Sequence, residues 1–293
     1  MKVMATSISG ASATLLLATL CASAQPAANK AEELRDPAEI VRRSIERSRG
    51  AWQALRDYTF IQTTENRRKD GDGKVTKTES ETEEVLIIEG QPFTRVIARN
   101  GKPLSGEEQR KERERMDAEI KKRLGETPEQ RAGRLKAYEE DRMRRGAILD
   151  EIPKAFDFKL AGSEIVDGRP VYVVEAYPKP GYHGLHKYSK YLPKLKGKLW
   201  IDKEDYHWAK LEAESIDTVS VGWILARIQE GSKLVLLQKH VGPDTWFPQR
   251  VSLDATLRIL LVKRMGMEVI TQFSDYKKFQ ADSRVVATQE LPQ

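Results

Sequence analysis

Residues 197–217 read GKLWIDKEDYHWAKLEAESID, and this stretch decides the predicted fold class of the chain. Residues 198–202 form a short apolar strand, and the charged residues 203–205 form a turn. Residues 206–214 then form a second strand, since apolar and polar side chains alternate along it. Strict alternation places one set of side chains on each face: Ala209, Leu211 and Ala213 against Tyr206, Trp208 and Lys210. The stretch therefore predicts a β-hairpin.

The same pattern recurs on both sides of this hairpin. Runs rich in β-branched and aromatic residues predict further strands at 58–64, 74–88, 93–99, 156–160, 163–166, 171–177, 219–228, 233–241, 247–261 and 267–273. Turn-forming residues separate many of them, notably at 70–73, 91–92, 100–101 and 167–170. Short turns between successive strands predict an antiparallel meander. We expect an α+β, mainly β fold: one large curved antiparallel sheet, an unclosed β-barrel with covering helices.

The sequence also predicts two helical regions, one before the first strand and one between strands. Asp36 as N-cap and Pro37 as first residue predict a helix, and Trp52 and Leu55 are expected to dock it onto the sheet. Residues 105–145 are highly charged and predict a helical hairpin that breaks at 125–128. We interpret this insertion as a solvated excursion, with a lid or a partner-binding arm as the alternative.

We expect a signal peptide at 1–24, one domain at 25–280 with a helical insertion at 105–150, and a flexible tail at 281–293.

The N-terminus predicts export. Lys2 precedes an apolar stretch centred on residues 15–17, and Ala22 and Ala24 flank a small-residue cleavage site, so we expect a cut after Ala24. Lipidation at Cys21 is the alternative, although Leu20 before it is larger than such a signal needs. Removal of the signal would leave no cysteine, and no later segment is apolar enough to span a membrane. We expect a periplasmic protein.

Charge and motifs exclude several classes of function. The 50 basic and 44 acidic residues are intermixed, which is typical of solvated surfaces, and no basic patch with interleaved aromatic residues predicts nucleic-acid binding. Metalloprotease, serine-hydrolase and phosphate-loop motifs are absent from the sequence. We therefore predict neither an enzyme nor a cofactor. One alternative is a metal-dependent hydrolase that uses His183, His186 and His207, with Asp202 or Asp205 as a carboxylate ligand.

Several strands are apolar on both faces, as in residues 223–228 and 234–237. One face would pack on helices, and the other could line a hydrophobic cavity or belong to a thick core. The residues that we expect to contact a ligand are Trp200, Trp208, Trp223, Leu225, Leu234 and Leu236.

The order of these features resembles the LolA/LolB-like superfamily of periplasmic lipoprotein carriers, which includes RseB-type regulators. The resemblance rests on the signal peptide, the helix before the Tyr58 strand, and residues 197–202, 208–212 and 273–279. It implies an unclosed β-barrel whose concave face holds acyl chains, with a role in outer-membrane biogenesis. The predicted function is thus an exported carrier or sensor for a lipid or lipoprotein, with an envelope or membrane-surface protein as a further partner. A non-catalytic interaction module of an envelope complex is the alternative.

Overall fold

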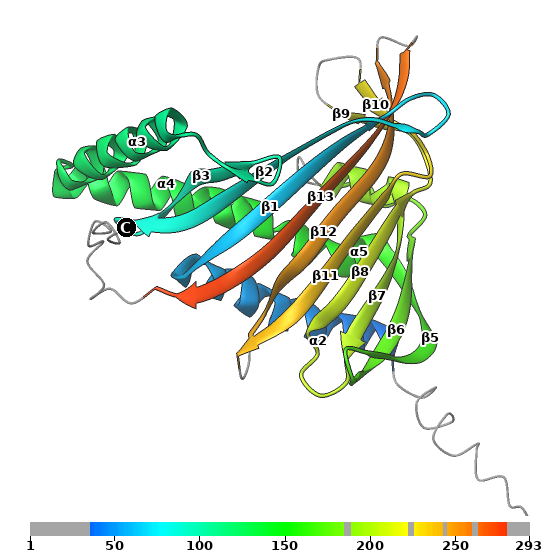
Figure 1. The fold of residues 1–293 in the computed structure, drawn as a ribbon. Coiled ribbons are helices and arrows are strands. Elements are labelled where there is room, and N and C mark those ends of the chain that lie inside the picture. The colour runs from blue at the N-terminus through cyan, green and yellow to red at the C-terminus, as the bar shows by residue number, and fades with distance from the viewer. Residues whose placement is uncertain (1–35, 185–188, 222–225, 243–244, 260–262, 280–293) are drawn as a thin grey trace, which may run out of the picture. The chain divides into compact units, whose positions relative to one another are not determined.

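The sheet dominates the structure, a computed structural model that describes residues 36–184, 189–221, 226–242, 245–259 and 263–279 (Figure 1). Within these ranges it has 13 strands in the order β4-β3-β2-β1-β13-β12-β11-β8-β7-β6-β5, with β10 paired to β12 and β9 paired to β10. Every strand pair is antiparallel. Within the described residues the end strands β4 and β5 do not pair with each other, so the sheet is not closed. The predicted fold class is confirmed.

The strands fall into two groups along the chain. The first group is β1 Tyr58–Lys69, β2 Val75–Ile88, β3 Gln91–Arg99 and β4 Lys102–Pro103. The second group is β5 Phe156–Val166, β6 Arg169–Pro178, β7 Leu195–Asp202, β8 Trp208–Ser215, β9 Val219–Val221, β10 Ala226–Ile228, β11 Lys233–Gly242, β12 Thr245–Ile259 and β13 Lys263–Lys278. The last strand, β13, pairs with β1 and joins the two groups into one sheet.

Tight turns connect the strands largely where the sequence predicts them. Asp70 closes the β1–β2 hairpin because its Oδ1 accepts hydrogen bonds from the backbone N–H groups of Asp72 and Lys74. The β2–β3 turn lies at Glu89 and Gly90, whose φ angles are 44° and 78°. The prediction of this turn at residues 91–92 was wrong by two positions, because Pro92 sits inside β3 opposite Ile87.

The helical insertion connects the two edges of the sheet. It consists of α3 Gly106–Leu124, α4 Pro128–Gly146 and α5 Ile148–Ala155, and it follows β4 at one edge and precedes β5 at the other. Capping boxes begin α3 at Ser105 and α4 at Thr127. The predicted solvated excursion is therefore also a crossover, and the sheet is not a simple meander.

Two helices cover one face of the sheet, which we call the inner face; the opposite face is the outer face. They are α2 Pro37–Ala54, which begins at the predicted N-cap Asp36, and α5. Short 3-10 helices, η1 Leu55–Asp57 and η2 Ser189–Lys194, flank the strands. The main core joins Ile40, Val41 and Ile45 of α2 to Ala155, Phe156, Tyr172, Val174, Leu199, Ile201 and Trp208.

The predicted docking role of Trp52 was wrong, because this side chain is 41% exposed. Burial of α2 comes instead from residues closer to its N-terminus. In the part of the chain that the structure describes, no helix combines the length and the apolar character needed to cross a membrane.

Candidate ligand-binding cavity

The β7–β8 hairpin contains an irregularity that alternation alone does not predict. Trp200 lies opposite Lys210, whereas the next residue of β7, Ile201, lies opposite Trp208. Ala209 is thus an extra residue in β8, a β-bulge. The predicted faces were wrong for this reason: Trp208 belongs to the inner core with Ile201, while Ala209 packs with Trp200 in a separate cluster.

A cavity of about 350 Å³ lies between α5 and the inner face of the sheet. Small residues make its floor, since Ala176, Gly197 and Ala213 follow one another across β6, β7 and β8. A Cβ atom at Gly197 would lie 3.3 Å from the backbone oxygen of Glu212, so a larger residue would crowd the neighbouring strand. The lining also includes Ile148, Leu149, Ile152, Phe156, Leu192, Leu195, Leu199, Trp208, Leu211, Leu234, Leu236 and Val251, together with Lys196, Lys198 and Glu212, and the surface that these residues present to the cavity is almost wholly apolar.

Three of the six predicted ligand-contacting residues line this cavity: Trp208, Leu234 and Leu236. Leu234 is 37% exposed, so the cavity reaches solvent beside β11. Trp200 lies elsewhere: its Nε1 donates to Glu164 at 2.8 Å, and Lys210 Nζ lies 4.2 Å from its ring centroid. Trp223 and Leu225 lie outside the described residues.

Specific polar contacts hold the cavity walls in place. Trp208 Nε1 donates to the Ser44 hydroxyl at 2.8 Å, and Ser44 in turn donates to the Val41 carbonyl oxygen at 2.7 Å. On α5, the buried Glu151 accepts hydrogen bonds from the Tyr182 hydroxyl at 2.6 Å and from Lys154 at 2.9 Å. A directed bond thereby attaches α2 to strand β8, and another attaches α5 to the loop that follows β6.

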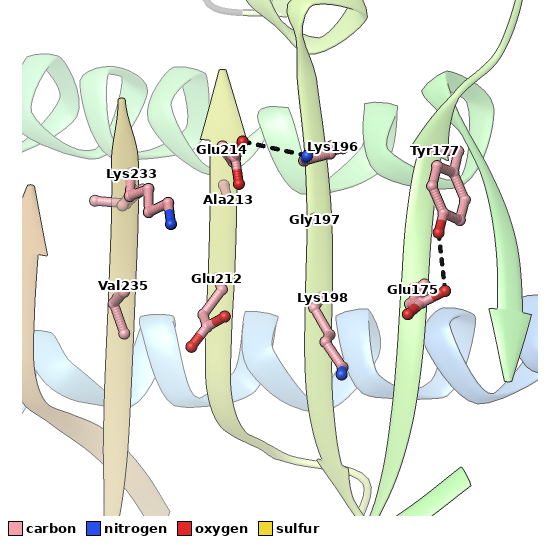
Figure 2. A pocket seen from close by; sticks show the side chains of 11 residues that line it. Glu175, Tyr177, Lys196, Gly197, Lys198, Glu212, Ala213, Glu214, Lys233 and Val235 are labelled. Carbon is pink, nitrogen blue, oxygen red and sulfur yellow. Dashed lines mark hydrogen bonds and ion pairs between the residues drawn. The ribbon is translucent and has the colours of Figure 1, made fainter. Parts of the chain in front are cut away.

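A second hollow, on the outer face, has the opposite character. Figure 2 shows Glu175, Lys198, Glu212, Lys196, Glu214 and Lys233 projecting from neighbouring strands, while helices pass behind the sheet. Two contacts hold groups of this hollow in place: the Lys196–Glu214 ion pair at 3.2 Å and the hydrogen bond from Tyr177 to Glu175 at 2.9 Å. An apolar ligand would have to desolvate these charges, so the inner cavity is the better candidate site.

A network of charged side chains lies at the β7–β8 turn, outside the cavity lining. Burial would raise the pKa of Asp202, but hydrogen bonds from Arg169 and from the backbone N–H groups of Glu204 and Asp205 hold it below its usual 3.8. His207 is 4% exposed, and its burial lowers its pKa below 6.5. Its ring stacks on Trp246, whose Nε1 donates to Asp205 at 2.9 Å. These contacts fix the conformation of the β7–β8 turn.

Among the residues that the structure places, no group of three or more His, Cys, Asp or Glu side chains could hold a metal ion. The hypothetical metal site also required His186, which falls outside the described residues.

The sequence analysis did not identify the residues that line the cavity on its α5 side, which we call the roof, or the small residues of its floor. The roof comes from Ile148, Leu149 and Ile152, whose spacing of one and four residues is typical of an apolar helix face. That signal could have identified α5. The floor depends on which small residues become neighbours across strands, and no local pattern contains that information.

No protein-family model and no curated protein sequence matches this chain. Among solved structures, it is similar to a Vibrio parahaemolyticus domain named for outer membrane lipoprotein sorting, with 14% identity and a TM-score of 0.33 over 84% of this chain and 95% of that one. A DUF1329 family protein from Desulfovibrio piger shows 12% identity and a TM-score of 0.33 over 85% and 96% of the two chains.

A LolA superfamily protein from Nitrosomonas europaea shows 12% identity and a TM-score of 0.28 over 84% of this chain and 94% of that one. Because the similarities are distant, the function proposed below rests on the geometry of this chain.

Proposed function

We propose that the protein binds the acyl chain of an amphiphile in the cavity between α5 and the inner face of the sheet. The observation that carries this proposal is a space of about 350 Å³ with an almost wholly apolar lining, within the size range of about 300–1,000 Å³ of small-molecule sites. Trp208, Leu234 and Leu236 would contact the chain, and the three floor residues leave room for it. The proposed role is that of a carrier or sensor, without catalysis.

The setting of this function is part of the proposal. Residues 1–24, with Lys2, the apolar stretch and the small residues before Gln25, support export to the periplasm. They lie outside the described residues. The partner would be a lipid or the acylated part of a lipoprotein, and a partner protein bound by the α3–α4 hairpin stays a separate prediction.

The two tryptophans of the β7–β8 hairpin provide a direct test of the cavity. Bromine atoms on an acyl chain quench a tryptophan only at close range, so a monoacylglycerol brominated in mid-chain should quench Trp208 but not Trp200. We expect saturable quenching in the native protein and in Trp200→Phe, and loss of most of it in Trp208→Phe. Mass spectrometry of lipids that purify with the protein would identify the natural ligand.

The proposal is wrong if the Trp200→Phe and Trp208→Phe variants lose equal amounts of quenching. It is also wrong if the native protein shows no saturable quenching although it is folded, as judged by its circular dichroism spectrum.

A further inference from the structure

The inner face of the sheet changes from apolar to polar along continuous rows of side chains. In an antiparallel sheet, residues directly opposite each other project from the same face. One row runs across ten strands from β5 to β3: Leu160, Val174, Leu199, Leu211, Leu236, Val251, Thr271, Thr64, Glu81 and Arg99. Its first six members are aliphatic and its last four are polar, so the change occurs between β12 and β13.

A neighbouring row repeats this order. It reads Phe158, Ala176, Gly197, Ala213, Leu234, Leu253, Val269, Asn66 and Glu79. Here the change occurs between β13 and β1. The apolar parts of both rows line or flank the cavity, and the polar parts begin one strand beyond Val251 of β12 in the first row and two strands beyond β12 in the second.

The distance along a row matches the length of an acyl chain. Adjacent strands lie about 4.8 Å apart, so three steps from β8 through β11 and β12 to β13 span about 14 Å. One acyl chain spans about 15 Å, half of the hydrocarbon thickness of a bilayer. A chain whose end rests over Ala213 and Leu211 would therefore place its head group over Thr271 and Thr64.

The polar strip that receives the head group is uncharged. Its members are Gln62, Thr64 and Asn66 on β1 and Thr271 on β13, and the hydroxyl oxygens of Thr64 and Thr271 lie 3.1 Å apart. Beyond the strip, Glu81 is paired with Arg99 at 2.9 Å, and Glu83 accepts a hydrogen bond from the Gln62 amide at 2.6 Å. A phosphate or carboxylate would find hydroxyl and amide groups at the strip itself, because the basic side chains of this face lie beyond it: Arg99 is paired with Glu81, and Arg68 and Lys77 lie two residues past Asn66 and Glu79.

We propose that the protein selects amphiphiles with an uncharged, hydrogen-bonding head group, such as the hydroxyl groups of a glyceride, over anionic ones of equal chain length. The inference rests on the proposed function, because the acyl chain must first occupy the cavity. It adds a second part to the site: beyond the aliphatic part from β6 to β12 lies the polar strip made by Gln62, Thr64 and Asn66 of β1 and Thr271 of β13.

The test compares two ligands with the same mid-chain-brominated acyl chain, a monoacylglycerol and a lysophosphatidate, by quenching of Trp208 in the full-length protein. We expect the monoacylglycerol to bind at least about tenfold more tightly, since one or two net hydrogen bonds separate the two head groups. Thr64→Val should weaken monoacylglycerol binding about fivefold while leaving the quenching at saturation unchanged.

The chain supplies a matched control. Thr63 is the neighbour of Thr64 on the outer face, and its hydroxyl oxygen also lies 3.1 Å from that of a cross-strand threonine, Thr82. Thr63→Val should therefore leave the affinity unchanged. Equal or tighter binding of the lysophosphatidate overturns the inference, as do equal effects of the Thr63 and Thr64 variants. If neither ligand quenches Trp208, the proposed function is wrong as well.

Discussion

His207 is the residue whose burial has the clearest consequence for stability. Its Nδ1 atom is buried 3.4 Å from Asp205 Oδ1 without making a hydrogen bond, and burial holds its pKa below 6.5. As the pH falls through 6.5, the unfolded chain therefore binds more protons than the folded chain. The free energy of unfolding decreases as a result. We expect the melting temperature to drop between pH 7.5 and about pH 5.5, and His207→Gln to flatten this dependence.

Other charged groups near His207 do not reverse this sign. Asp205 and Asp202 favour the protonated imidazole and Arg47 opposes it, but burial is the largest effect. Asp202 itself titrates below 3.8, outside this pH range. His183 is exposed and serves as the control, so His183→Gln should keep the native pH dependence. An unchanged slope in His207→Gln would show that another group causes the loss of stability.

At the scale of single elements, α3 covers the open edge of β3. The Val96 N–H donates to Glu112 Oε2 at 3.2 Å, and Arg115 donates to the Thr94 carbonyl oxygen. These side chains satisfy backbone groups where the two-residue strand β4 does not reach. We expect the double variant Glu112→Ala, Arg115→Ala to lose about 1–3 kcal/mol in urea unfolding and to self-associate in light scattering through the freed edge.

Arg110 and Glu114 provide the comparison on the same helix. They form an exposed ion pair at 2.6 Å, and replacing both by alanine should cost no more than about 0.5 kcal/mol. If this double variant were destabilised as much as the Glu112 and Arg115 variant, the edge contacts would have no special role.

The β7–β8 hairpin shows which features of an element the sequence alone predicts and which it does not. The apolar strands and the charged turn at 203–205 predict the hairpin correctly, since these patterns are local. The face of Trp208 could not be predicted, because the bulge at Ala209 shifts the register and only the pairing with β7 reveals it. The same limit applies to the cavity floor, where Ala176, Gly197 and Ala213 become neighbours through strand pairing.

At the scale of the whole molecule, the long crossover determines the arrangement of the site. Residues 104–155 carry the chain from the β4 edge to the β5 edge, and the last segment of this crossover, α5, becomes the roof of the cavity. The sequence predicts the sheet and the charged hairpin from local periodicity. It does not predict that β1 pairs with β13, because that contact joins residues about two hundred positions apart.

The space under α5 is either a binding cavity or a core that tolerates change poorly, and a substitution at Ala213 separates the two. Ala213→Phe would place a large side chain on the cavity floor. If the space is free, the variant should stay within about 1 kcal/mol of native stability, whereas overpacking a filled core costs about 1–3 kcal/mol. Binding of the brominated monoacylglycerol should weaken at least about tenfold, and the rise in melting temperature that the ligand gives the native protein should disappear.

Val235→Phe is the matched control, because Val235 lies on the outer face of β11, opposite Glu212, and borders the charged hollow. It enlarges the side chain outside the cavity, so ligand binding should remain native. A large loss of stability in Ala213→Phe would mean that protein side chains already fill the space. Native affinity in a stable Ala213→Phe variant would place the acyl chain elsewhere. A stable Ala213→Phe variant with binding weakened at least about tenfold would agree with an acyl chain that lies under α5, over the aliphatic part of the inner face.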